Sequence, residues 1–157
     1  PYRNGVAQTD APAEVGDLAW NQVAGYVVRV VTPEGLEVVT NLEETRRRRL
    51  PGGEELVEAE GWGVRDFVLV ASREFAHKEV LSDGVRLRSW YLSKDAEAGE
   101  KSLEEAREYL RFFSETYGAY PFTELDVVEA TLVGGAGGVE FSGMGSSGTQ
   151  FRKDPGY

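Results

Sequence analysis

The sequence predicts a mainly β protein with an α+β C-terminal part: an antiparallel β-sheet or β-sandwich, then one helix and one or two further strands. Three observations lead to this fold class. Short segments rich in β-branched or alternating residues, separated by turn signals, fill about residues 17–93. A segment with apolar residues at spacings of three and four covers 103–117, and another β-type segment covers 125–133.

The first strands follow a polar segment. Residues 1–16 are rich in Ala, Pro and Gly, and we expect them to form an extended lead-in. A strongly β-branched run covers 25–31, and the turn signal Thr32-Pro33-Glu34-Gly35 comes next. We therefore expect 36–40 to be the partner strand of this first strand.

The rest of the β module contains two single strands and a hairpin. Residues 56–60 alternate apolar and charged side chains, which predicts a strand with one buried face. The continuous apolar run 67–71 predicts a strand buried on both faces. Segments 74–81 and 85–92 flank Ser82-Asp83-Gly84, and Asp-Gly is a strong hairpin signal because glycine accepts the positive φ that such turns need.

A helix is expected after a polar linker at 94–101. Ser102-Leu103-Glu104-Glu105 is typical of a capping box, in which the Ser102 hydroxyl accepts a hydrogen bond from the backbone N–H of Glu105. The predicted helix therefore covers 103–117, with Gly118 at its end. Its expected apolar face consists of Leu103, Ala106, Leu110, Phe113 and Tyr117, widened by Tyr109 and Phe112.

These patterns divide the chain into a lead-in, an antiparallel β module over 17–93 and a C-terminal part over 94–157. The C-terminal part also contains the strand expected at 125–133 and a glycine-rich strand expected at 134–141. Four of the first five residues of this last segment are glycine. Glycine so frequent beside a strand suggests close approach of a ligand or another backbone.

Composition limits the classes of partner. The net charge is −10, from 27 acidic and 17 basic residues, which argues against nucleic acid as a partner. No run approaches the ~18 apolar residues of a membrane span. Cysteine is absent, so neither disulfides nor cysteine-bound metal are expected. The basic run Arg46-Arg47-Arg48-Arg49 lies between glutamates and is either a solvated segment or a docking patch.

Two residues are candidates for a chemical role, His77 and Glu140. His77 has no His or Cys companion at ligand spacing, which favours a structural or surface histidine over a zinc ligand or a catalytic base. Glu140 follows glycines in a segment poor in charge. It is either an exposed edge carboxylate without a role or a site for a cation such as the amine of a peptide N-terminus. Bare glycine backbone would let an extended peptide pair beside it as an added strand.

Several segments resemble one enzyme family. Residues 112–122, Phe-Phe-Ser-Glu-Thr-Tyr-Gly-Ala-Tyr-Pro-Phe, resemble the helix end and Phe-Gly-x-Tyr-Pro-Tyr segment of aminopeptidase N-like zinc peptidases, and 125–128 resemble the next strand. Residues 137–141, Gly-Gly-Val-Glu-Phe, stand where that family has Gly-x-Met-Glu-Asn. Residues 63–72 resemble the last part of its N-terminal β domain. The resemblance is good over about 60–145.

The resemblance implies a part of a zinc aminopeptidase that removes N-terminal residues from peptides. Residues 94–157 would begin its thermolysin-like catalytic domain. Glu140 would help hold the substrate's free α-amine, and the backbone of Gly137, Gly138 and Val139 would line the peptide. The family's zinc helix, His-Glu-x-x-His, would lie downstream, so zinc is expected in the full-length parent and neither zinc nor catalysis in this fragment.

Two other hypotheses about function are compatible with the sequence. Two residues depart from the family's motif: Val139 stands in place of its Met and Phe141 in place of its Asn. The chain could instead come from a non-catalytic family member that serves as a scaffold, or be an unrelated β-sandwich interaction module. Exposed sheet edges could also let the fragment dimerise.

Overall fold

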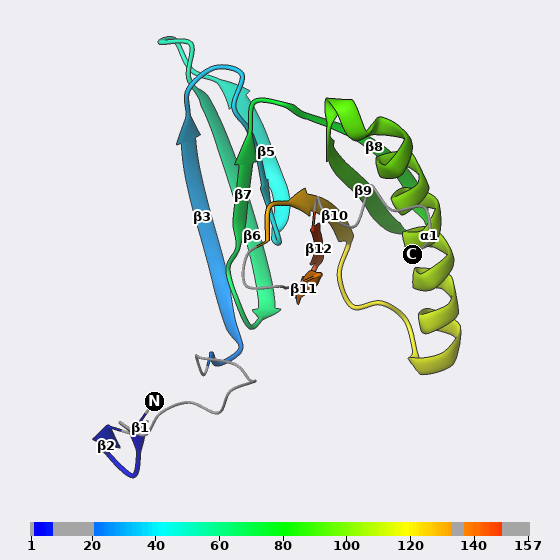
Figure 1. Cartoon of the computed structure of the whole chain (residues 1–157). Coiled ribbons are helices and arrows are strands. Elements are labelled where there is room, and N and C mark those ends of the chain that lie inside the picture. The colour runs from blue at the N-terminus through cyan, green and yellow to red at the C-terminus, as the bar shows by residue number, and fades with distance from the viewer. Residues whose placement is uncertain (1, 8–20, 133–136, 149–157) are drawn as a thin grey trace.

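The structure is a computed structural model that describes residues 2–7, 21–132 and 137–148. These residues form β-sheets and one long helix, as the sequence predicts (Figure 1). The strands of the first half are β1 (Tyr2–Arg3), β2 (Val6–Ala7), β3 (Ala24–Thr32), β4 (Glu37–Thr40), β5 (Glu43–Arg49), β6 (Glu55–Val64) and β7 (Leu69–Ser72). The rest are β8 (Phe75–Ser82), β9 (Val85–Leu92), a 3₁₀ turn (Ser93–Asp95), α1 (Ala96–Tyr117), β10 (Glu124–Ala130), β11 (Gly138–Phe141) and β12 (Met144–Gly148).

The first half forms three antiparallel sheets: the pair β1-β2, the three-stranded sheet β3-β6-β5 and the pair β4-β7. The prediction that the first strand pairs with residues 36–40 is therefore wrong. The predicted turn does form, with the Leu36 N–H donating to the Pro33 carbonyl at 3.2 Å. It nevertheless sends the chain into the β4-β7 sheet, because β3 pairs along its whole length with β6, from Ala24 to Thr32.

The second half builds a five-stranded mixed sheet in the order β11-β12-β10-β9-β8. Its β8–β9 hairpin confirms the Asp-Gly prediction, since Asp83 and Gly84 both have positive φ, 52° and 82°. β10 runs parallel to both β9 and β12. The sheet thus continues across the boundary expected between residues 93 and 94.

Helix α1 begins at Ala96, six residues before the predicted capping residue. The expected capping box is wrong: Ser102 lies inside the helix and its Oγ donates to the Ala98 carbonyl at 2.9 Å. The predicted end is confirmed, because the Gly118 N–H donates to the Ser114 carbonyl at 3.1 Å. Figure 1 shows α1 against one face of the β8–β9 hairpin.

Two more predictions need correction. Residues 67–71 were expected to be buried on both faces, but β7 begins at Leu69, pairs only with β4 and alternates between exposed and half-buried residues. The expected strand 125–133 is β10, which ends at Ala130, where its pairing with β12 ends. Residues 134–136 of the expected glycine-rich strand lie outside the described residues, and β11 covers its end.

The core has separate clusters on the two faces of the five-stranded sheet. Val39 from the first half packs with Trp90, Val128 and Met144 on one face. Val85, Leu87 and Leu110 pack beneath α1 on the other. Within the described residues, no helix is both long and apolar enough to cross a membrane.

Candidate peptide-binding edge

Glu140 lies on β11, the last strand at one edge of the five-stranded sheet. Its side chain is exposed, and its cross-strand partner is Gly145. A Cβ placed on Gly138 would lie 3.6 Å from Glu140 Oε1, whereas one placed on Gly145 would meet nothing within 4 Å. The carboxylate therefore lies among bare glycine backbone at an edge strand that has no second partner in the described part of the chain.

The opposite face of β11 anchors the strand. Phe141 packs against the cluster of Val39, Trp90, Val128 and Met144. The Ser146 hydroxyl donates to the Val139 carbonyl at 3.2 Å, and the Gly148 N–H donates to the Gly137 carbonyl at 2.9 Å. The Phe at position 141 thus has a packing role, which its sequence position alone did not indicate.

The turn after β11 is held by the first half of the chain. Gly143 has φ 82°, and a Cβ there would lie 2.7 Å from the Asn41 carbonyl oxygen, so only glycine fits. Asn41 Nδ2 donates to the carbonyls of Asp66 at 2.7 Å and Ser142 at 3.0 Å, while its Oδ1 accepts from the Val68 N–H at 2.9 Å. One buried amide therefore fixes three segments to each other.

A buried ionic network lies on the same side of the sheet. Arg88 Nε and Nη2 donate to the two Asp126 carboxylate oxygens at 2.7 and 2.9 Å, and Nη2 also donates to Glu124 at 2.9 Å. The Trp90 indole donates to Asp126 at 2.8 Å. Burial raises the pKa of both carboxyls, and the nearby arginines offset this only in part. These contacts hold β9 and β10 together.

Sequence reasoning missed this network and the role of Asn41. A signal did exist, because Glu124 and Asp126 alternate on one strand as Arg86 and Arg88 do on another. The parallel register pairs them directly, Glu124 with Arg86 and Asp126 with Arg88. Without knowledge of that register, the two alternating pairs look like ordinary solvent-facing charges. Asn41 offered no comparable pattern.

The other candidates have structural surroundings. His77 is the cross-strand partner of Trp90, with ring centroids 4.2 Å apart. On β5, Arg47 bridges Glu37, Glu44 and Glu55. Arg46 pairs with Glu58 and Arg49 with Glu34, and both arginine side chains remain largely exposed, as in a solvated segment. Across the ranges described, no group of three or more His, Cys, Asp or Glu side chains could hold a metal ion.

A comparison with protein-family models found no match, and a comparison with curated proteins found none either.

Proposed function

We propose that this chain carries the substrate-side strand of a zinc aminopeptidase, which pairs with an extended peptide and holds its free α-amine at Glu140. The observation that carries the proposal is the exposed carboxylate on an edge strand between Gly138 and Gly145. An ammonium group is a suitable partner for such a carboxylate because the hydrogen bonds are charge-assisted. Unpaired backbone groups beside it could bind the peptide as an added strand.

The described residues do not fit a zinc site, since they lack the group of ligands that zinc requires. Their part is to bind and orient: β11 sets the direction of the peptide, Glu140 fixes its amino end, and the Ser142-Gly143 turn keeps the strand in place. In the proposed full-length enzyme, zinc would be held by the His-Glu-x-x-His helix that the resemblance places downstream.

Binding to the chain itself tests the amine site. The probes are trialanine amide and its N-acetyl form, which lacks the positive charge, titrated by NMR. We expect the free-amine form to bind at least about tenfold more tightly, through the charge-assisted contact, and Glu140→Gln to remove that difference. Glu79→Gln, on the exposed surface of β8, is the control that should preserve it. Equal binding of the two probes by the wild-type chain would refute the proposal.

Kinetics would test the same role in an aminopeptidase that contains this chain. Glu140→Ala should lower kcat/KM for a free peptide by roughly thirty- to a thousand-fold, about 2–4 kcal/mol, because the amine contact positions the scissile bond. The N-acetylated peptide should be a poor substrate and nearly insensitive to the change. Equal losses on both peptides would remove Glu140 from this role.

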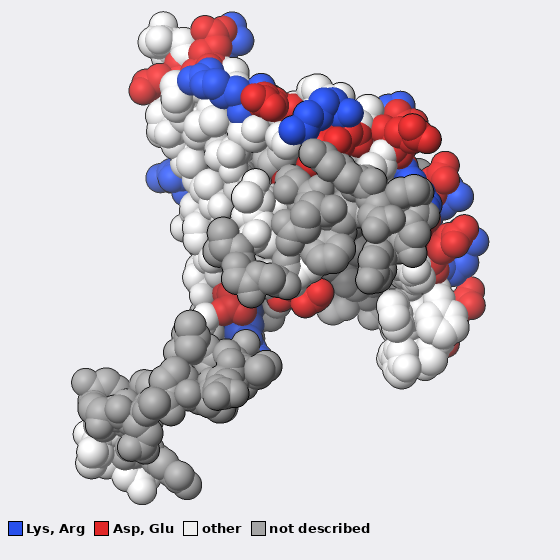
Figure 2. All heavy atoms as spheres, in the orientation of Figure 1, with Lys and Arg blue, Asp and Glu red and all other residues white. Residues whose placement is uncertain are grey.

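An interaction module is the second candidate, favoured by a different observation. The C-terminal half of α1 exposes Tyr109, Phe112, Phe113 and Tyr117, the last of them 79% exposed. Figure 2 shows an uncharged surface at this end of the helix. A large exposed aromatic surface is typical of protein contacts. Loss of partner binding on Phe112→Ser, with the peptide titration above negative, would favour this function.

A further inference from the structure

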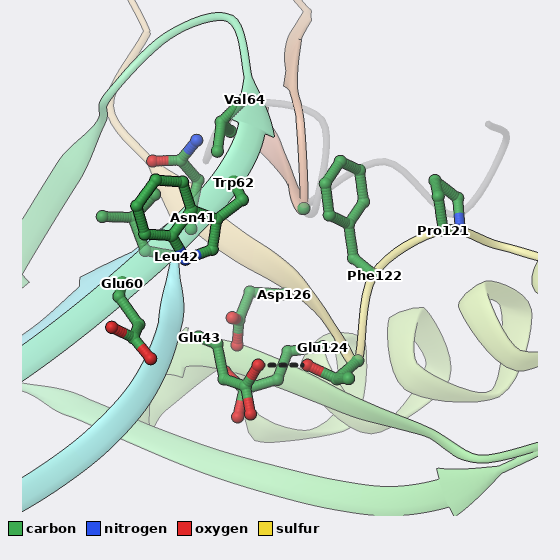
Figure 3. Close-up of a pocket in the computed structure, with 13 residues that line it drawn as sticks. Asn41, Leu42, Glu43, Glu60, Trp62, Val64, Pro121, Phe122, Glu124 and Asp126 are labelled. Atoms are coloured by element: carbon green, nitrogen blue, oxygen red, sulfur yellow. Dashed lines mark hydrogen bonds between the residues drawn. The ribbon is translucent and has the colours of Figure 1, made fainter. Parts of the chain in front are cut away.

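We propose that a cavity, separate from the Glu140 edge of β11, binds the positively charged end of a basic side chain from a peptide or protein. The cavity lies where β6 of the three-stranded sheet meets the loop before β10 and the turn after β11 (Figure 3). Its aromatic and apolar lining includes Trp62, Phe122, Leu42 and Val64. Its lining also contains four carboxylates and neither lysine nor arginine.

The charge of the cavity is not fully balanced. Asp126 and Glu124 form ion pairs with Arg88 and Arg86, which do not line the cavity. Glu43 and Glu60 also line it, and the structure gives neither an ion pair within the described ranges. The Thr123 hydroxyl donates to Glu43 at 2.8 Å and orients that carboxylate. The cavity thus has about two uncompensated negative charges, which suits a cation.

An aromatic ring, that of Trp62, lines one side of the cavity. Trp62 is 71% exposed, which is unusual for so large an apolar side chain. The ring lies against the backbone of Gly25, where a Cβ would come within 2.4 Å of it, so glycine at that position is what lets the ring lie there. Figure 3 shows the rings of Trp62 and Phe122 on two sides of the cavity, with carboxylates below them in this view. Aromatic faces attract cations, and Trp does so best.

The size of the cavity selects the class of ligand. Its volume is about 200 Å³, below the roughly 300–1,000 Å³ of pockets for drug-sized molecules. A single lysine or arginine side chain suits this volume, with its alkyl stem against Leu42 and Trp62 and its charge near Glu43 and Glu60. Glu124 also lines the cavity, but its Oε1 is enclosed by the protein and lies 2.6 Å from Arg86, so the cation is expected at Glu43 and Glu60 instead.

A titration with blocked amino acids tests the site without involving Glu140. The probes are Nα-acetyl-lysine methylamide and its neutral analogue Nα-acetyl-norleucine methylamide, both without an α-amine. We expect saturable binding of the lysine probe, followed by the NMR shift of the Trp62 indole N–H, and at least about tenfold weaker binding of the norleucine probe. Absence of saturable lysine binding, or equal binding of both probes, would overturn the proposal.

Variants separate this cavity from general surface charge. Trp62→Leu should weaken lysine binding by about three- to thirtyfold, read from the shifts of other cavity residues, and Glu60→Gln should weaken it too. The matched control is Glu97→Gln, which removes the same charge from the first turn of α1 and should have no effect. An equal loss in the control, or a loss on Glu140→Gln, would show that the binding is not in this cavity. All four substitutions are at exposed positions, and the NMR spectrum of each variant shows whether the protein is folded.

Discussion

Arg88 is the main partner of two buried carboxylates of β10, Asp126 and Glu124. Its side chain is almost fully buried and is hydrogen-bonded to both Asp126 and Glu124. Arg88→Met would leave two carboxylates buried without their main partner, so we expect a loss of about 3–5 kcal/mol in the free energy of unfolding. Urea denaturation measures it.

Arg86→Met is the matched control for that change. Arg86 pairs with the same Glu124 at 2.6 Å, but its side chain is 44% exposed, so solvent can replace the contact. We expect the control to cost less than about 1 kcal/mol. Similar losses for the two variants would show that burial does not determine the strength of this network.

Tyr120 should make stability fall at alkaline pH. Burial, and then the negative charge of Asp126, raise its pKa from 10.0 to about 12. Because the folded-state pKa lies above the unfolded value, the stabilisation is fully present below pH 10 and is lost as the pH rises through about 12. Tyr120→Phe should flatten the stability profile in this window. Urea unfolding at several pH values, with tyrosinate absorbance to follow ionisation, would refute the assignment if the two profiles fell in parallel.

Within helix α1, a glycine is required by packing rather than by helix propensity. A Cβ on Gly99 would lie 2.0 Å from Tyr91 Cδ1. Alanine is favoured over glycine in a helix by about 1 kcal/mol, but here the collision should cost about 1–3 kcal/mol. We therefore expect Gly99→Ala to lower the thermal midpoint. Ser102→Ala, in the same helix, should change the free energy of unfolding by less than about 0.5 kcal/mol, because Ser102 does not cap the helix. A gain in stability for Gly99→Ala would contradict this packing.

The elements that the sequence predicted well are those specified by neighbouring residues. The Asp83-Gly84 turn has its own backbone requirement, and Gly118 ends α1 for a similar reason. The start of α1 was predicted too late because the first turns gain contacts from β8 and β9, including the Gly99–Tyr91 approach and the Lys78–Glu100 ion pair at 3.1 Å. The prediction of the strand that pairs with β3 was wrong because pairing depends on contacts along the whole length of both strands. A local turn signal carries no information about those contacts.

At the scale of the whole molecule, polar contacts between distant residues connect the two halves. The Asn41 side chain reaches the Ser142 carbonyl, 101 residues away, and the Glu44 N–H donates to Glu124 across 80 residues. Val39 completes an apolar cluster of the second half. The fold class and Glu140's place on a strand could be predicted from local patterns. The cavity could not be predicted, because its lining residues come from segments far apart in the sequence.

We expect two copies of the chain to associate through the exposed edge of β3. The two outer strands of the three-stranded sheet are β3 and β5. β5 contains Arg46 to Arg49, and charges of this kind discourage pairing with another chain. β3 is nine residues long, with Val27 70% and Val31 53% exposed, and its only charge, Arg29, is paired with Glu58. Of the two edges of the three-stranded sheet, β3 is therefore the less protected.

Antiparallel pairing of two copies of β3 would extend each sheet by the other. Val27→Lys should weaken this dimer by at least about tenfold, because it places a charge on the pairing strand and brings two like charges together near the centre of the contact. The position is exposed, so the monomer should remain folded. Sedimentation velocity over a concentration series measures the change, with Phe112→Ser on α1 as the control. If Phe112→Ser abolishes association and Val27→Lys does not, the copies meet through the aromatic end of the helix instead.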